Sequence, residues 1–536
     1  METDGWVRPK PGADDLIWDL NAERGWDHLD YHRSMQGPSK LRKLHHMVRW
    51  GTGVQYRVHC PDVQTAVRGL LERVFYHWET DDEGERHMVR PYRPEREVVF
   101  ATLGPARNAL LRHTWEVSPW TREQFLAPLS SSKLARYTEA ADSFEAEPIS
   151  PKDAYLQTFV KAEKLNVTAK SDPDPRVIQP RRPRFNYAVG RYTKAAEKML
   201  YKAIDKLFGN SVPTVMKGLN ADKRGAAFAR AWGLFDNPVA VGLDASRFDE
   251  HVSRGMLEFE HSVYLAIFRH DRELAEYLNM QLRNKGFVRS EDGYVRYRIE
   301  GSRMSGDINT SEGNIILMCL MVYAYMFGKG FRYHLFNDGD DCVLIFEREN
   351  LADLDDLPEW FAAMGMIMKV EEPVYELELV EFCQSHPIEV DPGVWRMVRD
   401  PRVTLSKDLA IVKPVRDEAT WTRYRYAVGQ CGLALAGDLP VLNHFYHSLQ
   451  KDAVLSKRQR ARMRRRGPET GMEYLALGMS PKFSEPSTCA RISFAKAFDI
   501  WPDMQIAMER EYARRRAQYV VPKSTSYVVD IFHLFR

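Results

Sequence analysis

The sequence predicts a mixed α/β (α+β) fold, and three observations support this prediction. An apolar run at 239–243 has the composition of a buried strand. Two further apolar runs flank the tight turn Asp338-Gly339-Asp340 and predict a hairpin over 333–346. The segments around them have helical spacing or unbroken apolar sequence, which predicts helices at 255–268, 310–328 and 358–364.

The amino-terminal elements are predicted as a mixture of helix and extended chain. Residues 1–45 are polar and rich in tryptophan, with weak periodicity, and they predict no element. Residues 46–150 mix helix with irregular structure, and apolar residues at helical spacing predict a helix over 64–76. The basic segment 151–235 is punctuated by prolines, so strands and loops are expected there.

The later elements are predicted from the lengths of apolar runs and from the position of a glycine that ends a helix. The longest apolar run, 315–328, is too short to span a membrane comfortably and predicts a core helix. Gly365 ends the helix predicted at 358–364, and a strand is expected at 366–371. After residue 391 the chain is predicted to be rich in helix. Without an internal repeat or long linker, one integrated body is favoured.

Basic charge is concentrated, although the formal net charge is only +2. Residues 161–194 carry nine Lys or Arg against three acids, and 451–466 carry eight against one. Such runs beside carboxylates suit an enzyme that handles phosphates and metals together. There is no P-loop, HExxH motif, Ser/His/Asp signature or zinc-like cysteine spacing, so helicase and protease functions are unsupported.

Three aspartates form the candidate catalytic set, and a fourth nearby is a candidate for nucleotide binding. Asp340 and Asp341 follow Gly339 in a turn, where neighbouring carboxylates repel each other unless a divalent cation neutralises them. Asp244 ends the strand predicted at 239–243, so it supplies an oxygen ligand from a second strand, as two-metal chemistry requires. Asp249, five residues on, suits hydrogen bonding to a ribose hydroxyl. The alternative is a set of solvated turn acids.

Residues 301–314 have the features of a segment that approaches nucleic acid closely. Small residues allow the backbone to come near a ligand. Thr310 and Asn314 are four residues apart and share one helical face, so both are expected to reach the same ribose. A 2′-hydroxyl both donates and accepts hydrogen bonds, which distinguishes RNA from DNA.

These motifs together resemble a known family. DASRFD at 244–249, SGDINTSEGN at 305–314 and GDD at 339–341, in that order, resemble motifs A, B and C of a viral RNA-dependent RNA polymerase. The amino-acid sequences of these motifs are most similar to those of tombusvirus-type (carmovirus-like) replicases of plus-strand RNA viruses. The further matches are to motif F at 159–164 and 175–181, motif D at 364–373 and motif E at 381–384.

The resemblance implies a right-hand architecture of fingers, palm and thumb, with the palm built on an antiparallel sheet with helices. It assigns 46–235, with 265–300, to an N-terminal layer and fingers. Residues 236–390 form the palm with motifs A to E, and 391–536 form the thumb. The extension 1–45 receives no role.

The resemblance also implies roles at the catalytic centre. Asp244, Asp340 and Asp341 are expected to bind Mg²⁺, with Mn²⁺ as a substitute. Lys369 is expected to protonate the pyrophosphate leaving group, the alternative being a strand lysine that covers apolar surface. Asp338 departs from the asparagine more frequent in the family. Either it tunes metal preference or it is a tolerated substitution.

Other residues are expected to hold nucleotide and RNA. The ribose is checked by Asp249, Thr310 and Asn314, and Ser305 borders the nascent base pair. The four cations expected to hold the triphosphate are Lys161, Lys164, Arg176 and Arg181, of which some contact the template instead; a solvated basic loop is the alternative. RNA contacts are expected at Lys133, Arg136, Gly306, Phe382, Cys383 and Gln384, with core packing an equal use of Phe382. The basic run 457–466 contacts RNA or a partner, or is a solvated helix face.

The implied partners are single-stranded RNA template, nascent RNA and NTPs, with initiation without a primer. No secretory signal is visible at 1–15. We therefore expect the host cytoplasm, at membrane-associated replication complexes reached through a viral or host recruiting partner, with no intrinsic transmembrane segment. Two alternatives remain: a reverse transcriptase or DNA polymerase, which the ribose-directed residues disfavour, and a catalytically inactive, polymerase-derived RNA-binding replication protein.

Overall fold

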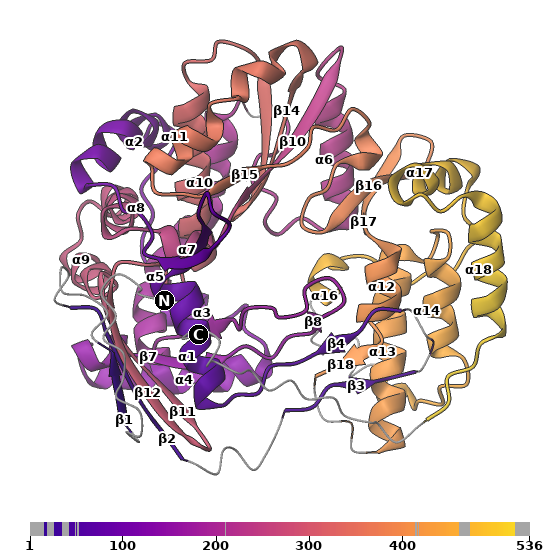
Figure 1. The fold of residues 1–536 in the computed structure, drawn as a ribbon, viewed down its shortest axis with the longest axis horizontal. Coiled ribbons are helices and arrows are strands. Elements are labelled where there is room, and N and C mark those ends of the chain that lie inside the picture. Colours follow the sequence, from indigo (N-terminus) through magenta and orange to yellow (C-terminus); the bar gives the residue numbers. More distant parts are fainter. Residues whose placement is uncertain are drawn as a thin grey trace.

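The computed structural model describes residues 15–18, 26–34, 42–48, 50, 53–209, 211–412, 415, 417–459 and 472–519. Helices and sheets are mixed along the chain, which confirms the α+β prediction. Figure 1 shows the elements arranged around a central region, with the last helices at the right and the sheet of β11 and β12 at the lower left. Most of 1–45, and the basic run beyond residue 459, lie outside the described residues.

A four-stranded antiparallel sheet lies at the top of Figure 1, in the order β13-β14-β10-β15. The predicted strand is β10 (Pro238–Ala245), and the predicted hairpin is β13 (Tyr333–Asp338) with β14 (Asp341–Glu347). β15 (Met368–Val370) begins later than predicted, because Gly365 takes a positive φ of 79° and the chain turns before the strand. Strand and hairpin predictions are confirmed.

Helices cover both faces of this sheet. On one face pack α2 (Arg96–Leu111), α8 (Arg254–Ile267), α10 (Thr310–Met326) and α11 (Leu357–Ala363). The central part of α10 is fully buried, which confirms a core helix and explains its unbroken apolar sequence. On the other face packs α6 (Ala221–Trp232). Among the described helices, none combines the length and apolar character that membrane crossing requires.

The prediction of strands and loops throughout 151–235 is wrong in its second half. Short strands occur first, at β7 (Leu156–Val160), β8 (Leu165–Asn166) and β9 (Val177–Ile178). A 25-residue helix, α5 (Pro183–Leu207), follows, and then α6. Pro183 occupies the first turn, where a missing N–H disrupts no hydrogen bond, so this proline begins a helix instead of breaking one.

A second sheet has the order β1-β2-β12-β11-β7-β9. Its remaining strands are β1 (Asp15–Trp18), β2 (His28–Arg33), β11 (Arg283–Ser290) and β12 (Gly293–Glu300). One face packs on α1 (Val63–Leu70), which continues into a π-helical turn, η1 (Leu71–Phe75). This confirms the helix predicted over 64–76.

The chain after residue 391 is rich in helix, as predicted. A hairpin of β16 (Ser385–Asp391) and β17 (Val394–Arg399) precedes α12 (Pro401–Lys407), α13 (Glu418–Ala436), α14 (Leu442–Gln450), α16 (Met472–Leu475), α17 (Thr488–Phe498) and α18 (Pro502–Arg514).

Amino-terminal strands join this part to the rest. β3 (His45–His46) pairs with β18 (Ala410–Ile411), and β4 (Tyr56–Arg57) pairs with β8. The remaining elements are β5 (His77–Thr80), β6 (Arg86–Val89), α3 (Arg122–Leu126), α4 (Ser131–Ala146), η2 (Pro151–Ala154), α7 (Phe248–His251), α9 (Arg272–Asn279), η3 (Arg348–Leu354) and η4 (Leu377–Leu379).

Candidate active site

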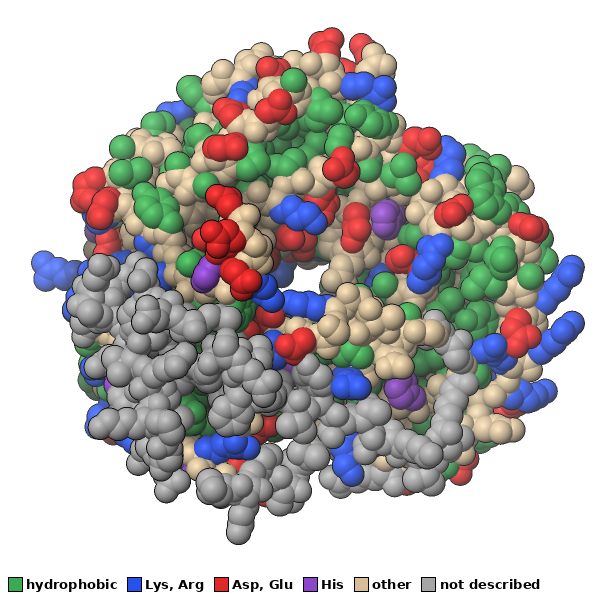
Figure 2. Space-filling view, in the orientation of Figure 1, with side chains coloured by type: hydrophobic (Ala, Val, Ile, Leu, Met, Phe, Trp, Pro, Cys, Tyr) green, Lys and Arg blue, Asp and Glu red, His purple; other side chains and the backbone are tan. Residues whose placement is uncertain are grey.

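A cleft of about 510 Å³ lies where β9, α7, α10 and the turn between β13 and β14 meet. It brings together predicted residues that are far apart in the sequence. These are Lys161, Arg176, Asp249, Ser305, Gly306, Thr310, Asn314 and Asp340. Figure 2 shows a narrow opening near the centre of the molecule, with both basic and acidic side chains around it.

Sheet register places the catalytic candidates side by side. Asp244 on β10 pairs directly with Asp341 on β14 and, across its other edge, with Lys369 on β15. Asp340 occupies the turn immediately before Asp341, after Gly339, which takes a positive φ of 91°. The side chains of all three aspartates and Lys369 reach solvent at this end of the sheet, although surrounding protein still desolvates the carboxyl groups of Asp340 and Asp341.

Two of these carboxyl groups, those of Asp340 and Asp341, have raised pKa values. Burial raises the pKa of Asp340 to about 6, and the charges of Asp341, Asp249 and Asp244 add to this shift. Burial likewise raises the pKa of Asp341, with further contributions from Asp244 and Glu371. A bound divalent cation would relieve this repulsion, and an all-oxygen donor set fits a hard cation.

The oxygens do not converge fully in this structure. Among the described residues, one group of three His, Cys, Asp or Glu side chains has ligand atoms within 4.8 Å of one another, and it lies elsewhere: His444, Glu485 and Glu509. Small side-chain rotations at the exposed ends of β10 and β14 would therefore accompany cation binding by Asp244, Asp340 and Asp341.

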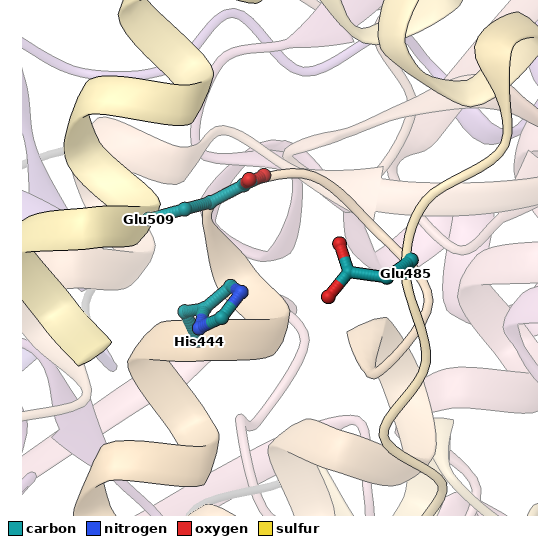
Figure 3. A group of neighbouring side chains, drawn as sticks. All are labelled: His444, Glu485 and Glu509. Carbon is teal, nitrogen blue, oxygen red and sulfur yellow. The ribbon is translucent and has the colours of Figure 1, made fainter.

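Figure 3 shows the side chains of His444, Glu485 and Glu509, which lie close together, and a guanidinium already contacts both carboxylates. Arg491 binds both oxygens of Glu509 at 3.0 and 3.1 Å and lies 3.9 Å from Glu485. Glu509 also accepts the N–H of Val441 at 3.0 Å. The guanidinium offsets the charge of Glu509 and, with the Val441 contact, ties α14, α17 and α18 together.

Asp249 is held by hydrogen bonds on both oxygens. Asn314 donates to Oδ1 at 2.8 Å, and Ser305 donates its hydroxyl to Oδ2. Arg303 donates to the Asn314 side-chain oxygen at 3.1 Å and forms a buried ion pair with Glu260. The structure therefore joins three predicted residues in one network.

Arg303 and Glu260 support this network, and neither was predicted to have a role. Arg303 lies within the 301–314 motif, so the sequence could have indicated a functional role for it. Glu260 lies in the middle of α8, outside every motif, and no sequence pattern indicates its role.

Thr310 lies in the same cleft but its hydroxyl faces the backbone. It is 2.9 Å from the carbonyl oxygen of Met304 and 3.0 Å from that of Asp307. These contacts close the loop before α10. The expected contact of Thr310 with a ribose stays a prediction.

The cleft contains more cationic side chains than were predicted to bind the triphosphate. Arg176 binds Glu163, which raises the pKa of its guanidinium, and burial together with Arg176 lowers the pKa of Lys161. Arg73, Lys217 and Arg247 also line the cleft. Arg247 lies inside the 244–249 motif, whereas nothing in the local sequence singles out Lys217.

Two cations predicted to bind triphosphate are not brought to the cleft. Arg181 is 1% exposed, and its guanidinium binds both oxygens of Asp307, at 2.5 and 3.1 Å. Lys164 donates to the carbonyl of Lys407 at 2.7 Å, and burial lowers its pKa to about 8. Both side chains connect parts of the fold.

The proposed RNA contacts are dispersed. Lys133 and Arg136 are exposed on α4, outside the cleft. Gly306 packs against the backbone of Gln179 and Pro180, where a Cβ would come within 2.8 Å of Pro180 N. This contact accounts for the glycine.

The segment 382–384 is divided between core and cavity. Phe382 is 3% exposed and packs 5.4 Å, ring to ring, from Phe228, which confirms its core use. Cys383 and Gln384 line a separate, mostly apolar cavity of about 190 Å³.

Asp338 is neutralised by two cations. Arg224 on α6 donates to its Oδ2 at 2.5 Å, and Lys217 lies 3.8 Å from Oδ1. Because these partners already occupy both oxygens, we expect Asp338→Asn to keep most nucleotide-incorporation activity, measured beside wild type under identical conditions. A loss as large as that of Asp340→Ala would contradict this expectation.

The sequence comparisons agree with this arrangement. The profile of the viral RNA dependent RNA polymerase family matches residues 31–520. Similar curated proteins are named RNA-directed RNA polymerase. Those of Pothos latent virus (isolate Pigeonpea/India), Tobacco necrosis virus (strain A) and Turnip crinkle virus are 43%, 40% and 40% identical to 88%, 93% and 89% of this chain.

The chain spans 61%, 67% and 60% of the length of these three relatives. The family profile nevertheless covers most of the chain, which confirms the resemblance carried by the motifs at 244–249, 305–314 and 339–341. This chain belongs to the viral RNA-dependent RNA polymerase family.

Proposed function

We propose that this protein is an RNA-dependent RNA polymerase that replicates a viral plus-strand RNA genome, with initiation that needs no primer. One observation carries the proposal. The paired carboxylates of β10 and β14 lie beside the Asp249–Asn314 network, and that network shares a cleft with Lys161 and Arg176. Metal ligands, ribose recognition and phosphate binding are thereby adjacent, as nucleotidyl transfer requires.

The proposed architecture is a right hand. Residues 46–235, with 265–300, form the fingers, 236–390 form the palm and 391–536 form the thumb. Three features support these boundaries: the four-stranded antiparallel sheet falls within 236–390, the six-stranded sheet is built mainly from the first set, and the helix-rich part follows 391.

The proposed mechanism assigns each side chain one task. Asp244 and Asp340, assisted by Asp341, would hold divalent cations, for which we propose Mg²⁺ with Mn²⁺ as a substitute. When bound, the cations supply Lewis-acid activation of the 3′-hydroxyl and neutralise charge on the phosphates. Lys161 and Arg176 bind the triphosphate, the Arg through its planar fork and the Lys as a point charge.

Substrate selection and proton transfer use the neighbouring groups. Asp249 and Asn314 share a hydrogen bond and both line the cleft, and we propose that this pair contacts the ribose 2′-hydroxyl. Ser305 holds Asp249 from the other side. Lys369 is exposed on β15 and pairs with Asp244 across the sheet, and we propose that its ammonium donates a proton to the leaving pyrophosphate.

The proposed partners are a single-stranded RNA template, nascent RNA and NTPs. For localisation we propose the host cytoplasm at membrane-associated replication complexes, reached through a viral or host recruiting partner.

Labelled NTP incorporation on single-stranded RNA with Mg²⁺ tests the function. Wild type is expected to incorporate rNTPs well and dNTPs weakly. Asp340→Ala is expected to lose activity by about three orders of magnitude or more, because a metal ligand contributes several kcal/mol to transition-state stabilisation. Asp355→Ala, an exposed acid away from the cleft, is the matched control.

Equal activity in wild type and Asp340→Ala would place the chemistry elsewhere. RNA binding without incorporation in wild type would instead favour an inactive RNA-binding replication protein.

A further inference from the structure

The outward face of the six-stranded sheet is basic and aromatic, while its other face is the buried side that packs on α1. Alternation along β11 and β12 sends one set of side chains outward. We define the basic sheet face as the outward residues of these strands: Arg283, Lys285, Phe287, Arg289, Tyr294, Arg296 and Arg298. It is separate from every residue assigned above to catalysis or RNA binding.

Strand register arranges these residues in rows. Lys285 pairs with Arg298, Phe287 with Arg296, and Arg289 with Tyr294. Paired residues on one face of a sheet lie about 5 Å apart. Two acids share the face: Asp30 lies 3.5 Å from Arg296, and Glu300 lies 2.8 Å from Arg283. Within the described part of the chain, Lys285, Arg289 and Arg298 have no acidic partner.

Aromatic rings interleave with the cations. The Arg296 guanidinium lies 4.7 Å from the centre of the Tyr294 ring, and Tyr294 stacks on His32 at 5.7 Å. The Arg289 guanidinium lies 5.8 Å from the Phe287 ring. Cations that follow a phosphate backbone, with flat rings between them, are the combination that binds single-stranded nucleic acid without sequence preference.

One end of the face is hollowed. Trp26 lies 5.6 Å from Arg283, 5.4 Å from Lys285 and 5.4 Å from Arg298, from ring centre to charged group. A cleft of about 400 Å³ runs between Trp26, Tyr155 and the cations Arg254, Arg283 and Lys285. Arg254 and Arg283 share Glu300, at 2.7 and 2.8 Å, so the hollow keeps an excess of positive charge, which favours a polyanion.

The other edge of the sheet reaches the active-site cleft. Phe159 on β7 is 47% exposed and pairs with Ile178 on β9, and Ile178 lines that cleft. Gln157, on the same side of β7 as Phe159, pairs with Phe287 of the basic sheet face. An RNA strand leaving the cleft past β9 would therefore cross β7 and then reach this face. Figure 1 shows β7 beside β11 and β12.

We propose that the basic sheet face binds single-stranded RNA outside the active-site cleft, by phosphate contacts and base stacking. The inference rests on the proposed polymerase function, since it extends the path of the RNA. Aromatic rings set between cations within the sheet favour RNA over an anionic membrane. A membrane-binding surface would instead present apolar side chains that protrude into the bilayer.

Fluorescence anisotropy with a labelled 20-nucleotide poly(U), titrated at several KCl concentrations, tests the proposal. The variant is Lys285→Gln/Arg289→Gln/Arg298→Gln. Its affinity should fall about tenfold or more, and the slope of log affinity against log salt should fall by about two, because each lost phosphate contact removes about 0.7. The control Lys198→Gln/Lys202→Gln/Lys206→Gln removes the same charge from the exposed side of α5 and should bind as wild type.

A second variant isolates stacking. Phe287→Ser/Tyr294→Ser should weaken binding about tenfold with the salt slope unchanged, because stacking releases no counterions. Wild-type melting temperatures in both variants would exclude misfolding. Binding to vesicles of 70% phosphatidylcholine and 30% phosphatidylserine is measured in parallel. The proposal would be overturned if both variants bound RNA with wild-type affinity, or if they lost affinity for the vesicles but not for RNA.

The two proposals fail independently. Asp340→Ala should bind the 20-mer like wild type, and the triple variant should still extend a short RNA that fits the active-site cleft. If wild type incorporates no nucleotide but the triple variant still loses RNA affinity, the polymerase assignment fails and the RNA-binding face stands.

Discussion

Replacing Arg303 by methionine is expected to lower the free energy of unfolding by about 3 to 5 kcal/mol. Arg303 and Glu260 are 2% and 0% exposed, so the substitution leaves the Glu260 carboxylate buried without its partner. Chemical denaturation of Arg303→Met and wild type at neutral pH measures the difference. Arg303→Met/Glu260→Gln should recover part of the loss, because it removes the unpaired charge.

The same substitution should also weaken sugar discrimination. Arg303 fixes the side-chain oxygen of Asn314, and the amide of Asn314 binds Asp249. Once this orientation is lost, the ratio of rNTP to dNTP incorporation should fall, even in assays at low temperature where the variant stays folded. Arg303→Lys should rescue poorly, since an ammonium does not reproduce the two-sided contact. An unchanged ratio would separate Arg303 from substrate selection.

Glu312→Gln is expected to remove a large pH dependence of stability. Glu312, in the first turn of α10, is 1% exposed. Burial raises the pKa of Glu312 well above its usual value, and the charges of Glu197 and Glu260 oppose ionisation further while Lys194 favours it. The folded state therefore retains a proton that the unfolded state releases above about pH 4.5.

The sign follows from this difference in proton binding. The stabilising contribution of Glu312 is complete below pH 4.5 and is lost as pH rises toward the raised pKa. It declines by about 1.4 kcal/mol per pH unit in that interval. Denaturation at pH 5, 6, 7 and 8 should show Glu312→Gln gaining on wild type at about this rate. Glu359→Gln, exposed on α11, is the control and should follow wild type. A constant offset across the series would mean that Glu312 is ionised in the fold.

Predictions based on local pattern succeeded for the elements nearest the candidate site. Val239 and Leu243 belong to an apolar run that could only be buried, and it forms β10. The 333–346 hairpin and the core helix α10 likewise followed from turn chemistry and length. The helix α5 was not predicted because a proline such as Pro183 can either begin a helix or break one, and the sequence does not distinguish the two. Its position in the first turn depends on where the preceding segment packs.

The chemical character of the candidate site can be predicted without a three-dimensional structure. The order and spacing of Asp244, Asp340 and Asn314 indicate the family, because the identity of a side chain and its place on a strand or helix are local properties. Local properties of this kind can be recognised from the amino-acid sequence alone.

The pairing of charged groups, by contrast, depends on how the folded chain packs. It turned Arg181 toward Asp307 and Lys164 toward Lys407, and it brought Lys217 to the cleft and Glu260 to Arg303. The physical reason is that a buried charge is tolerated only with a partner, and such partners here come from segments distant in the chain. Which partner is in reach depends on the packing of whole elements, and no local pattern in the sequence records it.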